Sequence, residues 1–277
     1  MIVNADSAQI YRGLPILSAA PTARERGLAE HRLYGVQDGA LPCSAADWAA
    51  MARAEISDFH ASGRTPILVG GTGLYLRTLL DGIAPVPAID PTVRKRVREA
   101  PLEANQARLE RLDKEAAARL GPGDSARINR ALEVILSTGR TLAEWQRQRE
   151  GGIGDAVDLR PLILLPPREW LYARCDQRFA MMVQQGAVEE VTALLERGLH
   201  PNLPVMRGIG VAQIAAFLRS EISLEQAIAA GQQATRRYAK RQYTWFAHQP
   251  PAEWPRFYDQ LDQAHLPRAL ALVQPKG

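Results

Sequence analysis

An acid, a hydroxyl and an amide follow a short apolar run at the start of the chain. Asp6, Ser7 and Gln9 come soon after Met-Ile-Val, within the segment NADSAQIYRG (residues 4–13). A carboxylate can remove a proton from a substrate, and hydroxyl and amide groups can orient one by hydrogen bonding. The same residue types also serve as turn residues and helix caps. This segment is therefore a candidate site, and the residues around it in the fold decide whether it is functional or only a turn or cap.

A second candidate segment joins apolar residues to glycines. TPILVGGTGLY (residues 65–75) is typical of a buried strand that ends at Gly70, Gly71, Thr72 and Gly73. Glycine allows a close approach of the backbone, and free N–H groups at such a turn can bind phosphate. A tight turn into a helix would have the same pattern, so GGTG alone is a weak signal.

A third candidate segment mixes basic and aromatic residues near the C-terminus. TRRYAKRQYTWFAH (residues 235–248) suits phosphate contacts and base stacking, and RKRVR (residues 94–98) is a shorter basic run. The alternative for the longer segment is an amphipathic helix with its aromatics in the core and a solvated basic face. The alternative for RKRVR is a solvated helix face.

Three apolar runs predict the strands that would position these residues. They are MIVNAD (residues 1–6), PILV (residues 66–69) and PLILLPP (residues 161–167), and after the third run we expect helices only. A helix over residues 44–63, with a capping box at Ser44 and Asp47, separates the first two runs. Strand, helix, strand indicates a parallel α/β sheet, in which ligands bind beyond the carboxyl ends of the strands. The first two candidate segments should therefore line one crevice.

The chain changes character between residues 87 and 155. This region is charged, with helical patterns over residues 102–120 and 128–139, a third cap at Thr141, and a glycine-rich hinge over residues 151–155. We therefore expect an α/β core of residues 1–86 and 156–277, with a helical domain inserted over residues 87–155.

Composition narrows the classes of protein without deciding between them. The net charge of +4 and pI near 9.3 permit nucleic-acid binding but do not establish it. No apolar run is long enough to cross a membrane, and no signal peptide is visible. The two cysteines form no CxxC motif, so we expect neither a zinc site nor a disulfide scaffold. We expect a cytoplasmic monomer with no membrane partner.

The motifs taken in order resemble those of the tRNA dimethylallyltransferases, which are also called tRNA isopentenyltransferases. The matching segments run through nearly the whole chain: NADSAQIYRG, HRLYG, CSAADW, PILVGGTGLYL, DPTVR, RINRALEV, RCDQRF, GIG and KRQYTWF. Single segments are weak signals, whereas the ordered set is specific. The resemblance implies a P-loop NTPase-like parallel sheet core with an inserted helical domain. It also implies transfer of a dimethylallyl group from dimethylallyl diphosphate to the exocyclic amine of the adenosine 3′ of the tRNA anticodon.

The resemblance also implies roles for individual residues in that reaction. Asp6 is the general base for the amine, Arg178 neutralises the diphosphate, and Thr72 contacts the substrate at the end of the second strand. Gly70 and Gly71 contact the diphosphate, and Mg²⁺ bridges its oxygens. No residue is assigned as a metal ligand.

A larger set is assigned by the resemblance to the tRNA anticodon stem-loop, with the helical insertion acting as a clamp. The residues near the first strand take the flipped adenine, and the others contact the surrounding RNA. The set comprises Asp6, Ser7, Ala8, Gln9, Thr72, Arg94, Ala126, Arg127, Ile128, Asn129, Arg130, Arg207, Gly208, Ile209, Gly210, Val211, Ala212, Lys240 and Arg241. Ala126, Val211, Ala212 and Ala247 depart from the family pattern, and each departure removes a polar contact.

One feature of the resembled family is missing from this sequence. The family pattern begins with a strand, the loop G-x-x-x-x-G-K-S/T and a helix, but this sequence contains no Gly-Lys dipeptide. We therefore expect that Met1 lies inside what should be the second strand. Roughly thirty residues, the usual span of a βαβ unit, would precede it.

Two other functions are compatible with parts of the sequence. The chain could be a relative of the P-loop small-molecule kinases, although the absent Walker A loop and the basic aromatic segment argue against this. Alternatively, the chain as written could be an RNA-binding remnant without catalytic activity, because it lacks the expected phosphate loop.

Overall fold

The computed structural model describes residues 1–274 and divides the chain into two compact units. The first unit comprises Met1–Leu79 and Ala156–Gly277, and the inserted unit comprises Leu80–Asp155. The insertion was expected to begin at residue 87. It begins earlier because Ile83 and Glu150 pair through two backbone hydrogen bonds of 3.0 Å, which tie the entering segment to the leaving one.

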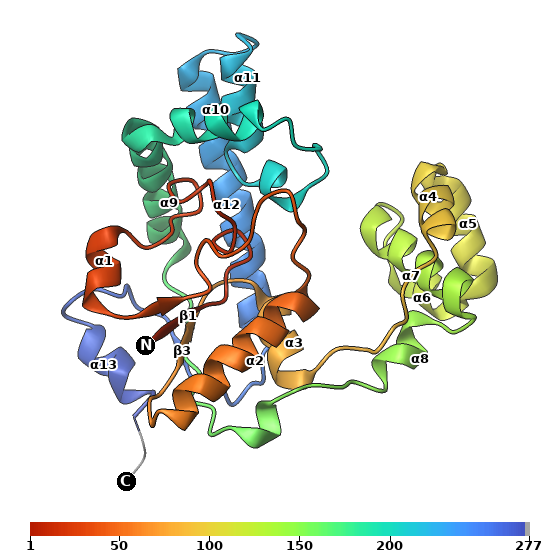
Figure 1. Cartoon of the computed structure of the whole chain (residues 1–277), viewed down its shortest axis with the longest axis horizontal. Helices are drawn as coiled ribbons and strands as arrows, with labels where there is room; N and C mark the ends of the chain where they lie inside the picture. The colour runs from red at the N-terminus through yellow and green to blue at the C-terminus, as the bar shows by residue number, and fades with distance from the viewer. Residues whose placement is uncertain (275–277) are drawn as a thin grey trace. The chain divides into compact units, whose positions relative to one another are not determined.

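A small parallel sheet lies in the first unit (Figure 1). Its order is β2-β1-β3, formed by β1 (Ile2–Asn4), β2 (His31–Arg32) and β3 (Ile67–Val69). The predicted parallel pairing of the first two apolar runs is confirmed, with Ile2 opposite Ile67 and Asn4 opposite Val69. The carboxyl ends of β1 and β3 therefore lie side by side, as the candidate site requires.

The third apolar run does not join this sheet, which corrects the prediction. β4 (Ile163–Leu164) pairs in parallel with β5 (Arg256–Phe257) in a separate two-stranded sheet. The expectation of helices only after residue 167 is also wrong, because β5 is a strand. Its two residues, one of them an arginine, are too few to show a strand pattern in the sequence. Within residues 1–274, β3 pairs only with β1 and β4 only with β5, so each keeps one edge without a backbone partner.

Helix α2 (Ala45–Ala61) begins where the sequence predicts. Ser44 and Asp47 form the expected capping box, and Gly63 beyond the end of the helix has φ 67°. Trp48 on its buried face donates from Nε1 to the carbonyl of Asn4 at 2.8 Å. The helix is thereby fixed against the end of β1.

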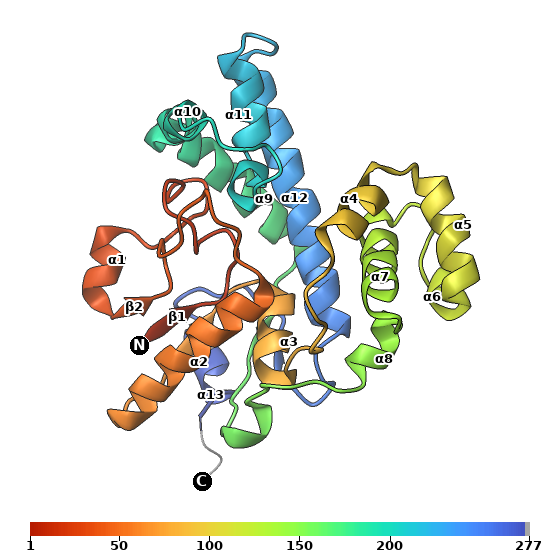
Figure 2. The same cartoon turned by 45° about the vertical axis from the view of Figure 1, so that its right-hand side comes forward.

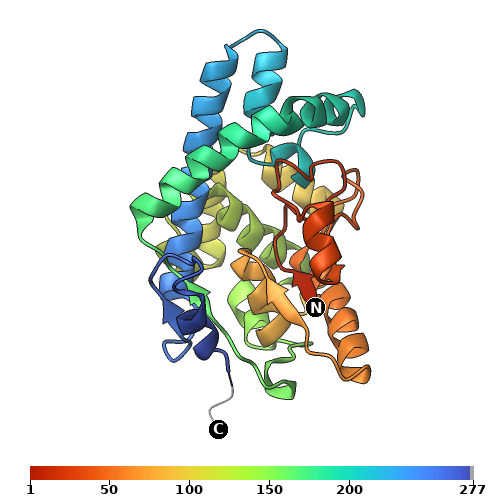
Figure 3. The same ribbon diagram turned by 90° about the vertical axis from the view of Figure 1, so that its left-hand side faces the viewer.

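Helices α9 (Arg168–Met182) and α12 (Leu224–His248) pack closely against each other (Figure 3). A Cβ on Gly231 of α12 would lie 2.1 Å from the Phe179 ring of α9, so only glycine permits this approach. Helix α11 (Val211–Leu218) packs beside α12 (Figure 2). The remaining helical segments of the first unit are α1 (Ala23–Leu28), α3 (Gly73–Asp81, which ends in the inserted unit), η2 (Val183–Ala187), α10 (Val188–Glu196), η3 (Pro204–Arg207) and α13 (Leu266–Ala271).

The inserted unit is helical and has its own apolar core. Its helices are α4 (Pro91–Glu99), α5 (Leu102–Leu112), α6 (Lys114–Arg119), α7 (Ser125–Thr138) and α8 (Leu142–Gln146), followed by the short η1 (Gly154–Ala156) at the junction with the first unit. The predicted helix over residues 102–120 is divided at Asp113, whose carboxylate accepts from the backbone N–H of Ala116 at 2.9 Å and so caps a new helix. Val97, Leu109 and Leu132 lie in the core of this unit. Within residues 1–274, no helix is both long and apolar enough to cross a membrane.

Candidate functional site

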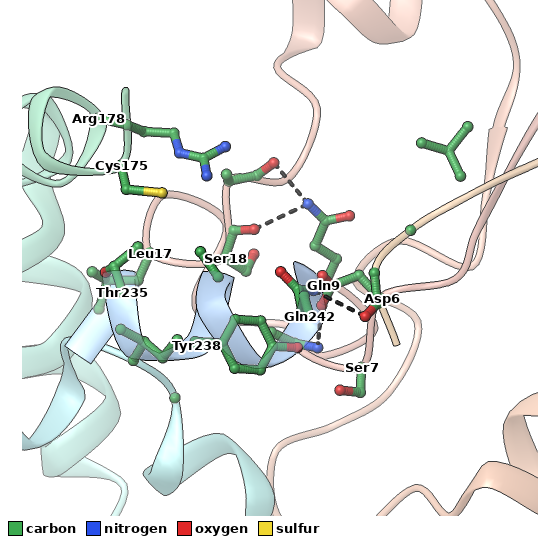
Figure 4. A pocket seen from close by; sticks show the side chains of 18 of the residues that line it. Asp6, Ser7, Gln9, Leu17, Ser18, Cys175, Arg178, Thr235, Tyr238 and Gln242 are labelled. Carbon is green, nitrogen blue, oxygen red and sulfur yellow. Dashed lines mark hydrogen bonds between the residues drawn. The ribbon is translucent and has the colours of Figure 1, made fainter. Parts of the chain in front are cut away.

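A cavity of about 820 Å³ opens in the first unit at the ends of β1 and β3. Its walls come from the segment after β1, the loop over residues 14–19, the ends of β3 and β4, and the facing sides of α9 and α12 (Figure 4). The unpaired edges of β3 and β4 line it through Val69 and Leu164, which are 49% and 45% exposed. Segments from both ends of the chain therefore meet at one site.

Asn4 fixes the backbone of Asp6 at the mouth of β1. Its Oδ1 accepts from the N–H of Asp6 at 2.7 Å, and its Nδ2 donates to the carbonyls of Asp6 and Leu33 at 2.9 Å each. Asn4 is fully buried. We did not single out this residue from the sequence, although a polar side chain within an apolar strand was a usable signal.

The Asp6 carboxylate lies in the cavity wall under two opposing influences. Burial raises its pKa, while the backbone N–H groups of Ala8 and Gln9 and the charge of Arg178 lower it in part, and the net shift is upward. Oδ1 accepts from the N–H of Ala8 at 2.8 Å. Arg178 extends from α9 into the same cavity (Figure 4). A partly desolvated carboxylate with a raised pKa is suited to accepting a proton.

Thr72 connects the GGTG turn to the segment after β1. Its Oγ1 accepts from the N–H of Ser7 at 2.9 Å and donates to Ser7 Oγ at 3.2 Å. The structure thus brings Asp6, Thr72 and Arg178 to one site, with Thr72 just behind the wall that Ser7 forms. Their chemical roles stay predictions.

The glycines after β3 are explained by close packing. A Cβ on Gly70 would lie 2.1 Å from the carbonyl carbon of Ala5, and one on Gly73 would lie 2.5 Å from the Trp245 ring. The carbonyl of Gly71 accepts from Gln242 Nε2 at 2.9 Å. Gly70 and Gly71 also line the cavity, so contact with a diphosphate is compatible with this packing.

The loop over residues 14–20 forms one wall and is held from both sides. Gln9 Nε2 donates to the carbonyls of Ser18 at 3.0 Å and Ala19 at 2.9 Å (Figure 4). The carboxylate of Glu190 in α10 accepts from the N–H groups of Ile16 at 2.6 Å and Leu17 at 3.0 Å, and burial raises its pKa. The Gln9 amide nitrogen is therefore engaged by the protein, and the role of Gln9 toward the adenine stays a prediction.

Helix α12 supplies further residues that the sequence analysis did not assign to the site. Tyr238 and Gln242 line the cavity, and the Tyr238 hydroxyl lies beside Thr72 and Gln242. Burial and the nearby Asp6 charge raise the Tyr238 pKa. Trp245 packs against Gly73, while Lys240 and Arg241 are exposed. Tyr243 and Phe246 also line the cavity, and base stacking by the aromatics of this segment stays a prediction.

The loop before α11 is divided between cavity and core. Arg207, Gly208 and Ile209 line the cavity, whereas Gly210 is buried and Val211 is 2% exposed. In the inserted unit, Ile128 is likewise 1% exposed within the core. The side chains of Val211 and Ile128 therefore pack inside the protein, and RNA contact at these positions stays a prediction.

The other expected RNA-binding residues of the inserted unit lie on α4 and α7. Ala126 and Arg127 are exposed, and Arg127 pairs with Asp124 at 3.1 Å. Asn129 and Arg130 are half-buried on the next turn of α7. Arg94 of α4 pairs with a buried acid that the sequence analysis had not singled out, described below.

Comparison with known proteins assigns the chain to a family. The model of the IPP transferase family matches residues 9–249. This chain belongs to the IPP transferase family. The tRNA dimethylallyltransferase of Novosphingobium aromaticivorans is 61% identical over 274 residues, covering 98% of each chain. That of Sphingopyxis alaskensis is 60% identical over 94% of this chain and 85% of the relative.

Solved IPP transferase structures resemble this one. A tRNA isopentenylpyrophosphate transferase from Bacillus halodurans is 29% identical with a TM-score of 0.68, over 98% of this chain and 86% of that one. A eukaryotic dimethylallyltransferase acting on tRNA is 26% identical with a TM-score of 0.74, over 88% of this chain and 62% of that one. The family and the α/β fold expected from the motifs are confirmed. The expected loss of an N-terminal segment is not confirmed.

The donor atoms of this IPP transferase do not form a metal site by themselves. Within residues 1–274 there is no group of three or more His, Cys, Asp or Glu residues placed to hold a metal ion. Asp6 is the only carboxylate among the cavity-lining residues of that range. Magnesium commonly binds through substrate phosphates and water, so Mg²⁺ stays a prediction tied to the diphosphate.

Proposed function

We propose that this IPP transferase transfers a dimethylallyl group from dimethylallyl diphosphate to the exocyclic amine of the adenosine 3′ of the anticodon in tRNA. The observation that carries the proposal is one cavity lined both by Asp6, a carboxylate whose pKa burial raises, and by the guanidinium of Arg178. The names of the similar tRNA dimethylallyltransferases support the same reaction. They do not favour a small-molecule kinase.

The proposed step needs a base on one side and a cation on the other. The amine nitrogen bonds to the allylic carbon, the bond from that carbon to the diphosphate oxygen breaks, and the amine proton passes to Asp6. A carboxylate whose pKa burial has raised accepts this proton more readily than an exposed aspartate. Arg178 offsets the charge that develops on the leaving diphosphate.

The diphosphate and the adenine would occupy different parts of the cavity. Arg178 with Gly70 and Gly71 is proposed to hold the diphosphate, and Mg²⁺ would be carried by its oxygens. The segment from Asp6 to Gln9 is proposed to receive the flipped adenine. Its backbone is held by Asn4 and Thr72, so little reorganisation is needed on binding.

Incorporation of labelled dimethylallyl groups into an anticodon stem-loop tests the proposed function. We expect transfer by the parent protein and a loss of at least about 100-fold in Asp6→Asn, because a positioned general base contributes that much or more. Stem-loop binding should persist in the variant. Absence of transfer by the parent protein would overturn the proposal.

A further inference from the structure

A buried acid in the inserted unit holds two arginines of a neighbouring helix. Glu133 of α7 is 1% exposed. Its Oε1 accepts from Arg98 Nε at 2.8 Å, and its Oε2 lies 3.8 Å from Arg94 Nε. Arg94 and Arg98 are one helical turn apart on α4, so one carboxylate serves both. Burying a charged carboxylate costs desolvation free energy, so a buried acid between helices suggests a role beyond stability.

A third cation lies beside the same carboxylate. Arg130, one turn before Glu133 on α7, is half-buried, and burial lowers its pKa, as does the charge of Arg94 and Arg98. Within the described residues 1–274, the Arg130 side chain has no hydrogen bond and no ion pair. Two guanidinium groups thus pair with one carboxylate and a third lies on the next turn of α7, which leaves a formal local charge of +2. Such an excess is stabilised when an anion binds.

The arrangement leaves the outer ends of the α4 guanidinium groups available. The Glu133 side chain is 2% exposed, whereas those of Arg94 and Arg98 are 49% and 63% exposed. Both arginines meet the carboxylate through Nε, and neither has a hydrogen bond from a terminal nitrogen to any residue in the range 1–274. The paired terminal N–H groups are the part of arginine that binds a phosphate in a fork.

A second buried polar residue braces the same helices. Asn105 of α5 is 3% exposed and donates from Nδ2 to the carbonyl of Val97 at 2.7 Å and to Asn129 Oδ1 at 2.9 Å. It therefore connects α4 and α7, the helices that carry the arginines. Buried hydrogen-bonded groups of this kind fix one arrangement of neighbouring helices.

We propose that Glu133 is a positioning residue that orients Arg94, Arg98 and Arg130 as one binding site for RNA backbone phosphate. The proposal rests on the proposed function, because it takes the tRNA stem-loop as the ligand. It adds Arg98 and Glu133 to the residues expected to serve RNA binding. A carboxylate beneath the cluster lowers its total charge but keeps the guanidinium groups from separating by mutual repulsion.

Glu133→Gln gives the proposal a test with a definite sign. Removing a negative charge beside a phosphate site should tighten binding if only overall charge matters. If Glu133 orients the arginines, binding of the stem-loop should weaken by about tenfold, comparable to losing a charge-assisted hydrogen bond. Glutamine has nearly the same shape, and a thermal unfolding scan reports whether the fold is retained.

Glu99→Gln is the matched control, because it makes the same chemical change on α4 at an exposed position. Glu99 is 66% exposed and pairs only loosely with Lys95, at 4.0 Å. We expect unchanged or slightly tighter stem-loop binding in this variant.

Steady-state kinetics give a second measurement for Glu133→Gln. The KM for the stem-loop should rise, while kcat and the KM for dimethylallyl diphosphate stay at parent values. General destabilisation of the protein would not produce this difference.

Arg98→Ala completes a double-mutant cycle with Glu133→Gln. Alone it should weaken binding and reduce the salt dependence by about one phosphate contact. If Glu133 acts through Arg98, the double variant should bind about as weakly as the worse single variant. Unchanged or tighter binding in Glu133→Gln, or strictly additive effects, would overturn the proposal. The binding measurements need no transfer, so their outcome is separate from whether the parent protein transfers a prenyl group; only the comparison of KM and kcat depends on transfer.

Discussion

Several polar and ionisable side chains of this protein are buried or half-buried, which is energetically unfavourable unless neighbouring groups hydrogen-bond or pair with them. Asp6 is a carboxylate that burial makes harder to ionise, and Asn4 keeps its backbone in place with three hydrogen bonds. Glu133 is buried under arginines, and Glu190 is a half-buried acid that holds a loop. Asn4, Glu133 and Glu190 thus each hold a group proposed to bind substrate or to line the cavity, and none of the three is itself proposed to touch substrate.

We expect Asp6→Asn to increase stability at neutral pH while it removes activity. The pKa of Asp6 is raised by folding, so the parent protein loses stability as pH rises through that pKa. Asparagine mimics the neutral acid and avoids this loss. Urea unfolding should show a gain for the variant at pH 7 that shrinks as pH falls through the raised pKa of folded Asp6 toward the pKa of an unfolded aspartate. A variant that is less stable at pH 7, with a gap that widens toward acid pH, would contradict the sign of the pKa shift.

At the scale of elements, the site depends on how closely β1, β3 and α12 approach one another. Gly70 lies against the Ala5 backbone, and Gly73 lies against Trp245. Gln242 on α12 donates to the carbonyl of Gly71. The glycine-rich turn is therefore the point where the sheet and the long helix meet, and its packing positions Thr72 against Ser7.

Gly70→Ala should destabilise the first unit by about 3 kcal/mol, because the new methyl group would meet backbone atoms that cannot rotate away. Gly27→Ala is the matched control, since a Cβ there meets nothing within 4 Å. It should be neutral or slightly stabilising in α1. Chemical denaturation of both variants provides the measurement. Equal stabilities would show that the sheet accommodates the methyl group.

At the scale of the whole molecule, two units with separate cores perform separable parts of the proposed function. The first unit holds the cavity, and the inserted unit holds the arginine cluster around Glu133. The inserted unit packs around Val97, Leu109 and Leu132 without residues of the first unit in that cluster. Its stability should therefore be adjustable without altering the cavity.

Leu109→Ala should loosen the inserted unit alone. Leu109 is 0% exposed, and a cavity of this kind costs roughly 2–5 kcal/mol. We expect faster hydrogen exchange in residues 80–155, weaker stem-loop binding and unchanged dimethylallyl diphosphate binding. Leu112→Ala on the same helix, where the side chain is 43% exposed, should have little effect. Faster exchange spread over residues 156–274 would show that the units are not energetically separate.

The sequence by itself determined the features that depend on neighbouring residues. The capping box at Ser44, the strands at β1 and β3, the helical insertion and the order of the family motifs all followed from local patterns. Local rules suffice there because caps and periodic apolar faces involve residues within a few positions of one another. The roles of Asp6, Thr72 and Arg178 came from the family resemblance and not from local rules, and they stay predictions.

Only the tertiary structure decided which polar groups are used within the protein. Hydrogen bonds join Ile16 to Glu190 and Gly71 to Gln242, and no local sequence pattern predicts either of them. The pairing of β4 with β5, the engagement of Gln9 and the burial of Val211 were likewise settled by packing between distant segments. The physical reason is that burial and hydrogen-bond partners depend on where the chain returns in space, and a two-residue strand or a single buried acid has no period of its own to reveal it.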